Sequence, residues 1–108
     1  MKLDLPMAIN VYTKGYYAGK AEEEVFHAME IEGFTPLKIR NNAGYIYYQH
    51  EHKETKLLAF LGGSMEITIE SEVYKCSKGD RIYIPGTILH EAVVGTDGCV
   101  FFWAEKVI

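Results

Sequence analysis

From Pro36 onward the sequence alternates between apolar and polar residues, with the period of two that is typical of β-strands. In its clearest stretch, residues 65–70, each apolar residue is followed by glutamate or threonine. Successive side chains of a strand point to opposite faces, so this stretch predicts a strand with one buried and one solvated face. Short breaks rich in glycine, serine, aspartate and proline separate the strand segments. The pattern therefore predicts an all-β fold, an antiparallel sandwich or barrel.

The breaks also predict how the later strands are connected. Strands are expected over residues 73–76 and 81–84, each bounded by a turn rich in polar residues, glycine or proline. The last apolar segment is interrupted at residues 95–98 by Gly-Thr-Asp-Gly. This interruption predicts a closing hairpin between strands at 90–94 and 99–104.

One segment ahead of the strands has helical character. Residues 20–32 are rich in good helix formers, carry acidic residues in the first turn and are followed by Gly33, a residue that often ends a helix. Val25, Phe26 and Met29 are expected to pack this short helix against the sheet, with His27 near the surface. We predict that residues 1–35 form an arm and helix packed on a barrel of residues 36–108, as one domain, because 108 residues suffice for a single core.

Composition narrows the classes of partner. The net charge is -4 and the basic residues are scattered, so we expect neither nucleic acid nor an anionic membrane as a partner. Apolar runs fall far short of the roughly 20 residues that span a bilayer, and the first residues do not resemble a signal peptide, which favours a cytoplasmic location. Cys76 and Cys99 are too far apart for a CxxC pair and are expected to be reduced and buried.

Three histidines form the strongest chemical pattern. His50 and His52 are separated by one residue, so on a strand they would project from the same face, and His90 belongs to another predicted strand. Neutral imidazoles bind zinc, iron, nickel and copper. A set of three protein ligands leaves coordination positions open for water and substrate, as in catalytic rather than structural metal sites.

The region 44–94 resembles the two sequence motifs of the cupin superfamily. The first motif is matched by the following residues: Gly44, His50, His52 and Gly63. Lys56 stands where that motif has its glutamate. The second motif is matched by these residues: Gly79, Pro85 and His90, with Gly86 one place early and Val94 in place of asparagine.

This resemblance implies a small single-domain cupin, an antiparallel β-barrel or jelly roll. It implies that His50, His52 and His90 hold one divalent transition metal, which could be Zn, Fe, Ni, Mn or Cu. It also implies a small-molecule ligand and a homodimer, with Trp103 and the last strand as the candidate dimer contact. The reactions that the family suggests are dioxygenation, decarboxylation and isomerisation of keto or enol compounds.

Lys56 changes the charge of such a site. A lysine cation about 5 Å from a divalent ion repels it by roughly 6 to 7 kcal/mol at an effective dielectric constant of ~20. The side chain could turn to solvent, pair with Glu54, lose its proton or face a bound anion. The last alternative favours an anionic ligand, with Lys56 as a candidate catalytic residue that steers or protonates it.

Parity along the strands predicts which other side chains face this pocket. Tyr48 and Ile46 lie an even number of residues before His50, so on a regular strand their side chains would point to the same face as His50. Tyr48 is therefore a second candidate catalytic residue, as a hydrogen-bond donor to the ligand. Glu54 is a possible replacement ligand, although it falls in a predicted turn. Glu91 is expected to point outward. Four further residues are assigned to the core or pocket wall: Phe60, Ile84, Phe101 and Trp103.

Two functions are consistent with these residues. The first is an enzyme with a mononuclear metal centre that acts on a small oxygenated substrate. The alternative is a metal-free module that binds or senses a small anion without turnover.

Overall fold

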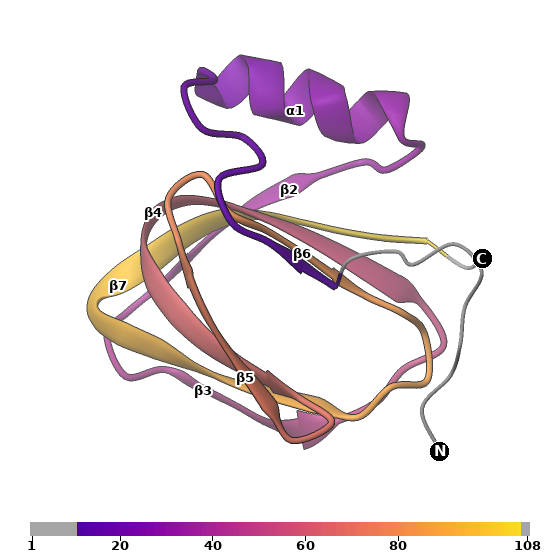
Figure 1. Cartoon of the computed structure of the whole chain (residues 1–108), viewed down its shortest axis with the longest axis vertical. Coiled ribbons are helices and arrows are strands. Elements are labelled where there is room, and N and C mark those ends of the chain that lie inside the picture. The colour runs from indigo at the N-terminus through magenta and orange to yellow at the C-terminus, as the bar shows by residue number, and fades with distance from the viewer. Residues whose placement is uncertain (1–10, 107–108) are drawn as a thin grey trace.

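The computed structural model describes residues 11–106 as one antiparallel sheet and one helix (Figure 1). The helix α1 is Glu22–Ile31. The strands are β1 Tyr12–Thr13, β2 Leu37–Asn41, β3 Ile46–His50, β4 Thr55–Ile69, β5 Glu72–Ser77, β6 Arg81–Ile84 and β7 His90–Lys106. The predicted arm lies in part outside the described residues, and its described part includes β1, which pairs with β6.

The sheet is built around β4 and β7, which pair with each other along almost their whole length. The first part of β4 also pairs with β6, and its second part pairs with β5. Correspondingly, β2 pairs with the end of β7 and β3 with its beginning. We call the part with β1, β2 and β6 the helix-side half and the part with β3 and β5 the far half. The predicted antiparallel all-β class is confirmed, but the sheet is folded over rather than closed into a barrel.

The two long strands bend where the sequence has its glycines. The β4–β7 register shifts on both sides of Gly62 and Gly63, opposite the segment that contains Gly98 and Cys99. The predicted hairpin at residues 95–98 is therefore wrong: β7 continues through this segment as one bent strand. Glycines allow a sharp bend as well as a turn, so composition alone does not separate the two.

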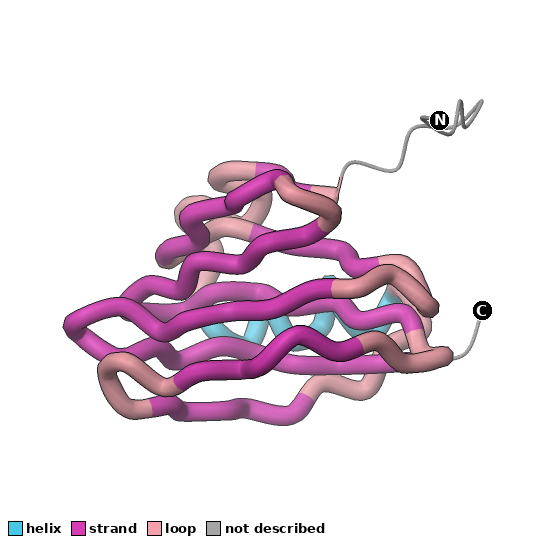
Figure 2. Tube along the Cα trace, turned by 90° about the horizontal axis from the view of Figure 1, so that it is seen from below, coloured by secondary structure: helices cyan, strands magenta, loops and turns pink. Residues whose placement is uncertain are grey.

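The helix covers the outer face of the helix-side half, as its apolar residues predicted (Figures 1 and 2). Val25 and Met29 are buried in one cluster with Phe34 and with residues of β4 and β7, namely Leu57, Ala59, Phe102 and Ala104. Gly33 ends the helix with a positive φ of 90°, and its N–H donates to the carbonyl of Glu30. The helix fixes one face of these strands, so the alternate residues face the interior.

The interior face carries the second core cluster. It contains Leu58, Phe60 and Phe101 from the helix-side half, and Met65 and Ile67 from the far half. Cys76 and Cys99 are free and buried in the same cluster, as expected. Within residues 11–106, no helix is long and apolar enough to cross a bilayer.

Candidate metal and ligand site

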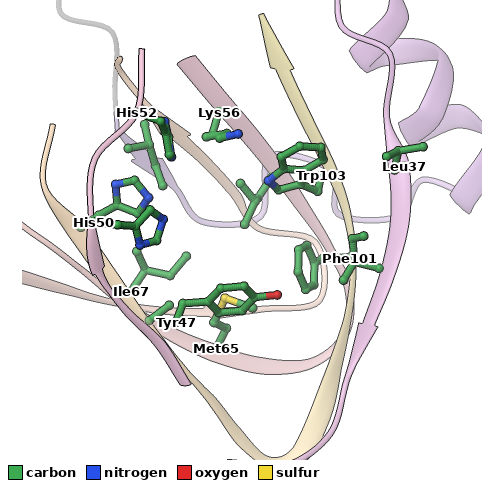
Figure 3. Close-up of a pocket in the computed structure, with 14 residues that line it drawn as sticks. Leu37, Tyr47, His50, His52, Lys56, Met65, Ile67, Phe101 and Trp103 are labelled. Carbon is green, nitrogen blue, oxygen red and sulfur yellow. The ribbon is translucent and has the colours of Figure 1, made fainter. Parts of the chain in front are cut away.

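A cavity of about 380 Å³ opens between the inner faces of the two halves (Figure 3). His50 and His52 lie at one side of it and Phe101 and Trp103 at the other, and Lys56 lies between His52 and Trp103. Its volume is at the lower end of the range of about 300 to 1,000 Å³ that is usual for small-molecule sites. Because its lining is mostly apolar with a few polar groups gathered in it, this cavity is the candidate ligand site among the described residues.

The structure brings the three predicted histidines together. One ring nitrogen each from His50, His52 and His90 lies within 4.8 Å of the other two. His50 ends β3 and is paired across the sheet with His90, which begins β7. His52 lies two residues past the end of β3, so it reaches the cluster from a loop rather than from a strand.

Each imidazole is oriented by a backbone carbonyl. The Nδ1 atoms of His50, His52 and His90 lie 2.5, 3.0 and 2.9 Å from the carbonyl oxygens of Tyr48, Glu54 and Ile88. Because a carbonyl accepts only from a protonated nitrogen, these contacts select the tautomer that carries the hydrogen on Nδ1, and in the neutral imidazole this tautomer has a free lone pair on Nε2. This arrangement is how metal-binding histidines are usually held.

The Nε2 atom of His52 provides the test of whether a metal fits. It is buried and has no hydrogen-bond partner among the described residues. A buried polar atom without a partner costs about 1 to 3 kcal/mol, so such atoms are rare. A divalent ion bound by the three Nε2 atoms would satisfy it, and the residues therefore fit a metal.

A turn after β6 holds the loop that carries His52. The N–H of Thr87 donates to the His52 carbonyl at 2.7 Å, and Thr87 has a positive φ of 68°. A Cβ added to Gly86 would lie 2.2 Å from the Lys53 carbonyl oxygen, so the turn and the loop are in direct contact. These contacts explain why this chain has glycine at position 86: the turn approaches the loop closely and sets the position of His52.

His90 is kept neutral by its surroundings. Its side chain is buried, and burial lowers its pKa, with the neighbouring His50, His52 and Lys56 acting in the same direction and the contact with the Ile88 carbonyl acting against it. A lower pKa means that the imidazole is unprotonated at neutral pH. His90 is therefore ready to act as a metal ligand without first losing a proton.

Lys56 lines the cavity, and its charge is paired by a residue that the sequence did not indicate. Its Nζ donates to Glu105, the residue opposite it on β7, and lies 4.2 Å from the ring centre of Trp103. Burial lowers the pKa of Lys56, and Glu54 acts in the opposite direction. The pairing with Glu105 reduces the repulsion that a metal would meet. Only knowledge of the β4–β7 register could have identified this partner.

The expectation that Tyr48 faces the pocket is wrong. Tyr48 is 78% exposed, and Tyr47 lines the cavity instead. The physical reason is an irregularity in β3: Tyr47 pairs with Ala92 and His50 with His90, so three steps along β3 correspond to two along β7. The extra residue reverses the parity between His50 and the residues before it. Ile46 is exposed for the same reason.

The other predicted wall residues lie close to where they were expected. Ile84, Phe101 and Trp103 line the cavity, and Phe60 is buried in the adjoining core. Neither Glu54 nor Glu91 belongs to the histidine cluster. Trp103 as a dimer contact, and the catalytic roles of Lys56 and Tyr48, stay predictions.

Comparison with known proteins identifies the fold but not the activity. No protein-family profile matches the sequence, and no curated protein matches it significantly. A solved RmlC-like cupin from Shewanella frigidimarina is similar, with a TM-score of 0.63 and 19% identity over 69% of this chain and 67% of that one. KdgF from Halomonas sp. has a TM-score of 0.59 and 22% identity, with 67% of each chain covered.

Oxalate decarboxylase from Bacillus subtilis is also similar, with a TM-score of 0.62 and 24% identity. The match covers 68% of this chain but only 21% of the decarboxylase. At these identities the likeness concerns the arrangement of the strands. It shows that this chain has the cupin fold.

Proposed function

We propose that the chain binds one divalent transition metal through the Nε2 atoms of His50, His52 and His90, together with a small anionic or keto/enol metabolite in the adjoining cavity. The buried Nε2 of His52, which has no hydrogen-bond partner within residues 11–106, is the observation that carries this proposal. The three Nδ1 contacts support it, because they occupy Nδ1 and leave Nε2 of each histidine as the nitrogen available to a metal. Oxalate decarboxylase, which shares the fold, has Mn(II) centres.

The reaction classes that we propose follow from the groups that the histidines and Lys56 can bind. A divalent ion with three imidazole ligands supplies a Lewis acid with open positions for ligand oxygens. Lys56 places a cationic donor in the wall of the same cavity, where it can orient an anionic ligand. The residues on the other side of the cavity are apolar. Dioxygenation, decarboxylation and isomerisation of keto or enol compounds are the reaction classes we propose.

The direct test is the metal content of the protein. Protein produced in metal-replete medium is expected to contain about one transition-metal ion per chain by elemental analysis, and the chelated protein is expected to recover one on titration. Bound metal is also expected to raise the melting temperature, because it binds the folded state. Protein that contains no metal and binds none on titration with Zn²⁺, Mn²⁺, Fe²⁺, Ni²⁺ and Cu²⁺ would contradict the proposal.

A metal-free module that binds a small anion is the second candidate, and the observation that favours it is the presence of Lys56 in the cavity wall. The two candidates differ in what Lys56 does. In the metal site its cation weakens metal binding, whereas in the anion module it is the main binding group. Lys56→Met should therefore abolish anion binding only in the second case.

The Lys56–Glu105 pair is expected to set the metal affinity. Glu105→Gln leaves the lysine unpaired and should weaken Zn²⁺ binding at least about tenfold, because a unit charge several ångströms from a divalent ion is worth several kcal/mol. Lys56→Met leaves the carboxylate unpaired and should strengthen it by a similar factor. The double variant should bind nearly as the parent does. Calorimetric titration of the four proteins measures this cycle, and equal affinities in all four would show that the pair does not act on the metal.

A further inference from the structure

The part of the cavity beyond the histidines is almost entirely apolar. Two pairs of residues face each other across β2 and β7: Leu37 with Trp103, and Ile39 with Phe101. All four line the cavity (Figure 3). They form a continuous apolar surface, which we call the β2–β7 wall.

The opposite side of the cavity is apolar as well. Tyr47, Ala92 and Ile67 lie side by side on β3, β7 and β4, and all three line the cavity. The hydroxyl of Tyr47 donates its hydrogen to Asn41 Oδ1 at 2.6 Å, so it has no hydrogen left to donate to a ligand. A ligand that extends past the histidines would therefore meet hydrocarbon and aromatic surface on both sides.

The polar groups are confined to one end. The three imidazoles and Lys56 belong to it, and Lys56 is held between Glu105 and the ring of Trp103. A purely polar ligand would place its second polar end against the β2–β7 wall and lose its hydration without replacement. An amphipathic ligand would match both ends of the cavity.

We propose that the ligand is a small carboxylate, of the 2-oxo acid or enol type, that carries an apolar aliphatic or aromatic group. This inference rests on the proposed function, which supplies the polar end. The carboxylate and its neighbouring oxygen lie at the histidines and Lys56, and the apolar group lies between the β2–β7 wall and the row of Tyr47, Ala92 and Ile67. Leu37, which is 56% exposed at the rim, is covered when the ligand binds.

The test is the calorimetric titration of Zn²⁺-loaded protein with four acids. Pyruvate, 4-methyl-2-oxopentanoate and phenylpyruvate share a 2-oxo carboxylate and differ in the group attached to it, and the fourth acid, oxalate, has no such group. Burial of a branched aliphatic or aromatic group should make the second and third bind about ten- to a hundredfold more tightly than pyruvate. Oxalate is the reference for the polar end alone, because its second carboxylate takes the place of the 2-oxo group and leaves the β2–β7 wall uncovered. Equal affinities for pyruvate and phenylpyruvate would overturn the inference and leave the metal site intact.

A matched pair of variants locates the apolar group. Leu37→Asn should reduce the preference for phenylpyruvate over pyruvate about five- to tenfold without changing Zn²⁺ affinity. Ile46→Asn is the control, because Ile46 is 49% exposed on the other outer strand and does not line the cavity. An unchanged preference in the Leu37 variant would overturn the assignment of the wall. Failure of Zn²⁺ binding contradicts the proposed function instead, and the same series on metal-free protein then decides the inference.

Discussion

His52→Ala is expected to weaken Zn²⁺ binding at least about a hundredfold while leaving the metal-free protein as stable as the parent. Zinc sites with four ligands bind with about 10 to 16 kcal/mol, so one ligand contributes on the order of 3 kcal/mol. The stability of the metal-free protein should change by less than about 1 kcal/mol. The variant loses the Nδ1 contact with the Glu54 carbonyl, but it also loses a buried Nε2 that has no partner in the described part of the chain. Metal titration and thermal unfolding of the chelated protein measure the two effects.

The helix provides the matched control. His27 is an exposed histidine whose Nδ1 contacts Glu30 on the same helix, far from the cluster in the sequence. His27→Ala should leave both Zn²⁺ affinity and stability unchanged, because exposed pairs of this kind contribute little. If His52→Ala instead lowered the stability of the metal-free protein by several kcal/mol and kept its metal affinity, His52 would be a structural residue and the proposed metal site would be wrong.

The sequence predicted the strands and the helix because their causes are local. Alternation at residues 65–70 requires only that one face of a strand be buried, and Gly33 ends the helix through its own backbone freedom. At residues 95–98 the glycines predict a turn, but the structure has a bend in β7, because β4 continues alongside it. Whether glycines produce a bend or a reversal is decided by the pairing partner, which lies elsewhere in the chain.

The site shows the same division between local and distant causes. The motif spacing predicted that His50, His52 and His90 would meet, and they do. The prediction for Tyr48 failed because strand parity holds only where the register is regular. The partner of Lys56 could not be inferred, since Glu105 lies 49 residues away and becomes a neighbour only through the β4–β7 register. The direction in which Tyr48 points and the partner of Lys56 thus both depend on pairing between strands that are distant in the sequence.

Gly63→Ala is expected to destabilise the fold more than any substitution considered above. Gly63 has a positive φ of 70°, and a Cβ added there would lie 2.0 Å from the Gly98 carbonyl oxygen. The left-handed backbone costs an alanine about 1 to 2 kcal/mol, and crowding in a packed site typically costs a further 1 to 3 kcal/mol. For a domain of this size the sum corresponds to a fall of at least about 10 °C in the melting temperature.

The adjacent glycine is the control for this substitution. Gly62 has no heavy atom within 4 Å of an added Cβ and no positive φ, so Gly62→Ala should leave the melting temperature unchanged or raise it slightly. Circular dichroism on heating compares the two variants directly.

Because β4 and β7 carry residues of both halves of the cavity, a forced change in their bend should move Lys56 relative to His90 as well. Gly63→Ala protein that remains folded should therefore also bind Zn²⁺ more weakly than the Gly62 variant, and equal stability of the two would show that the bend does not depend on this glycine.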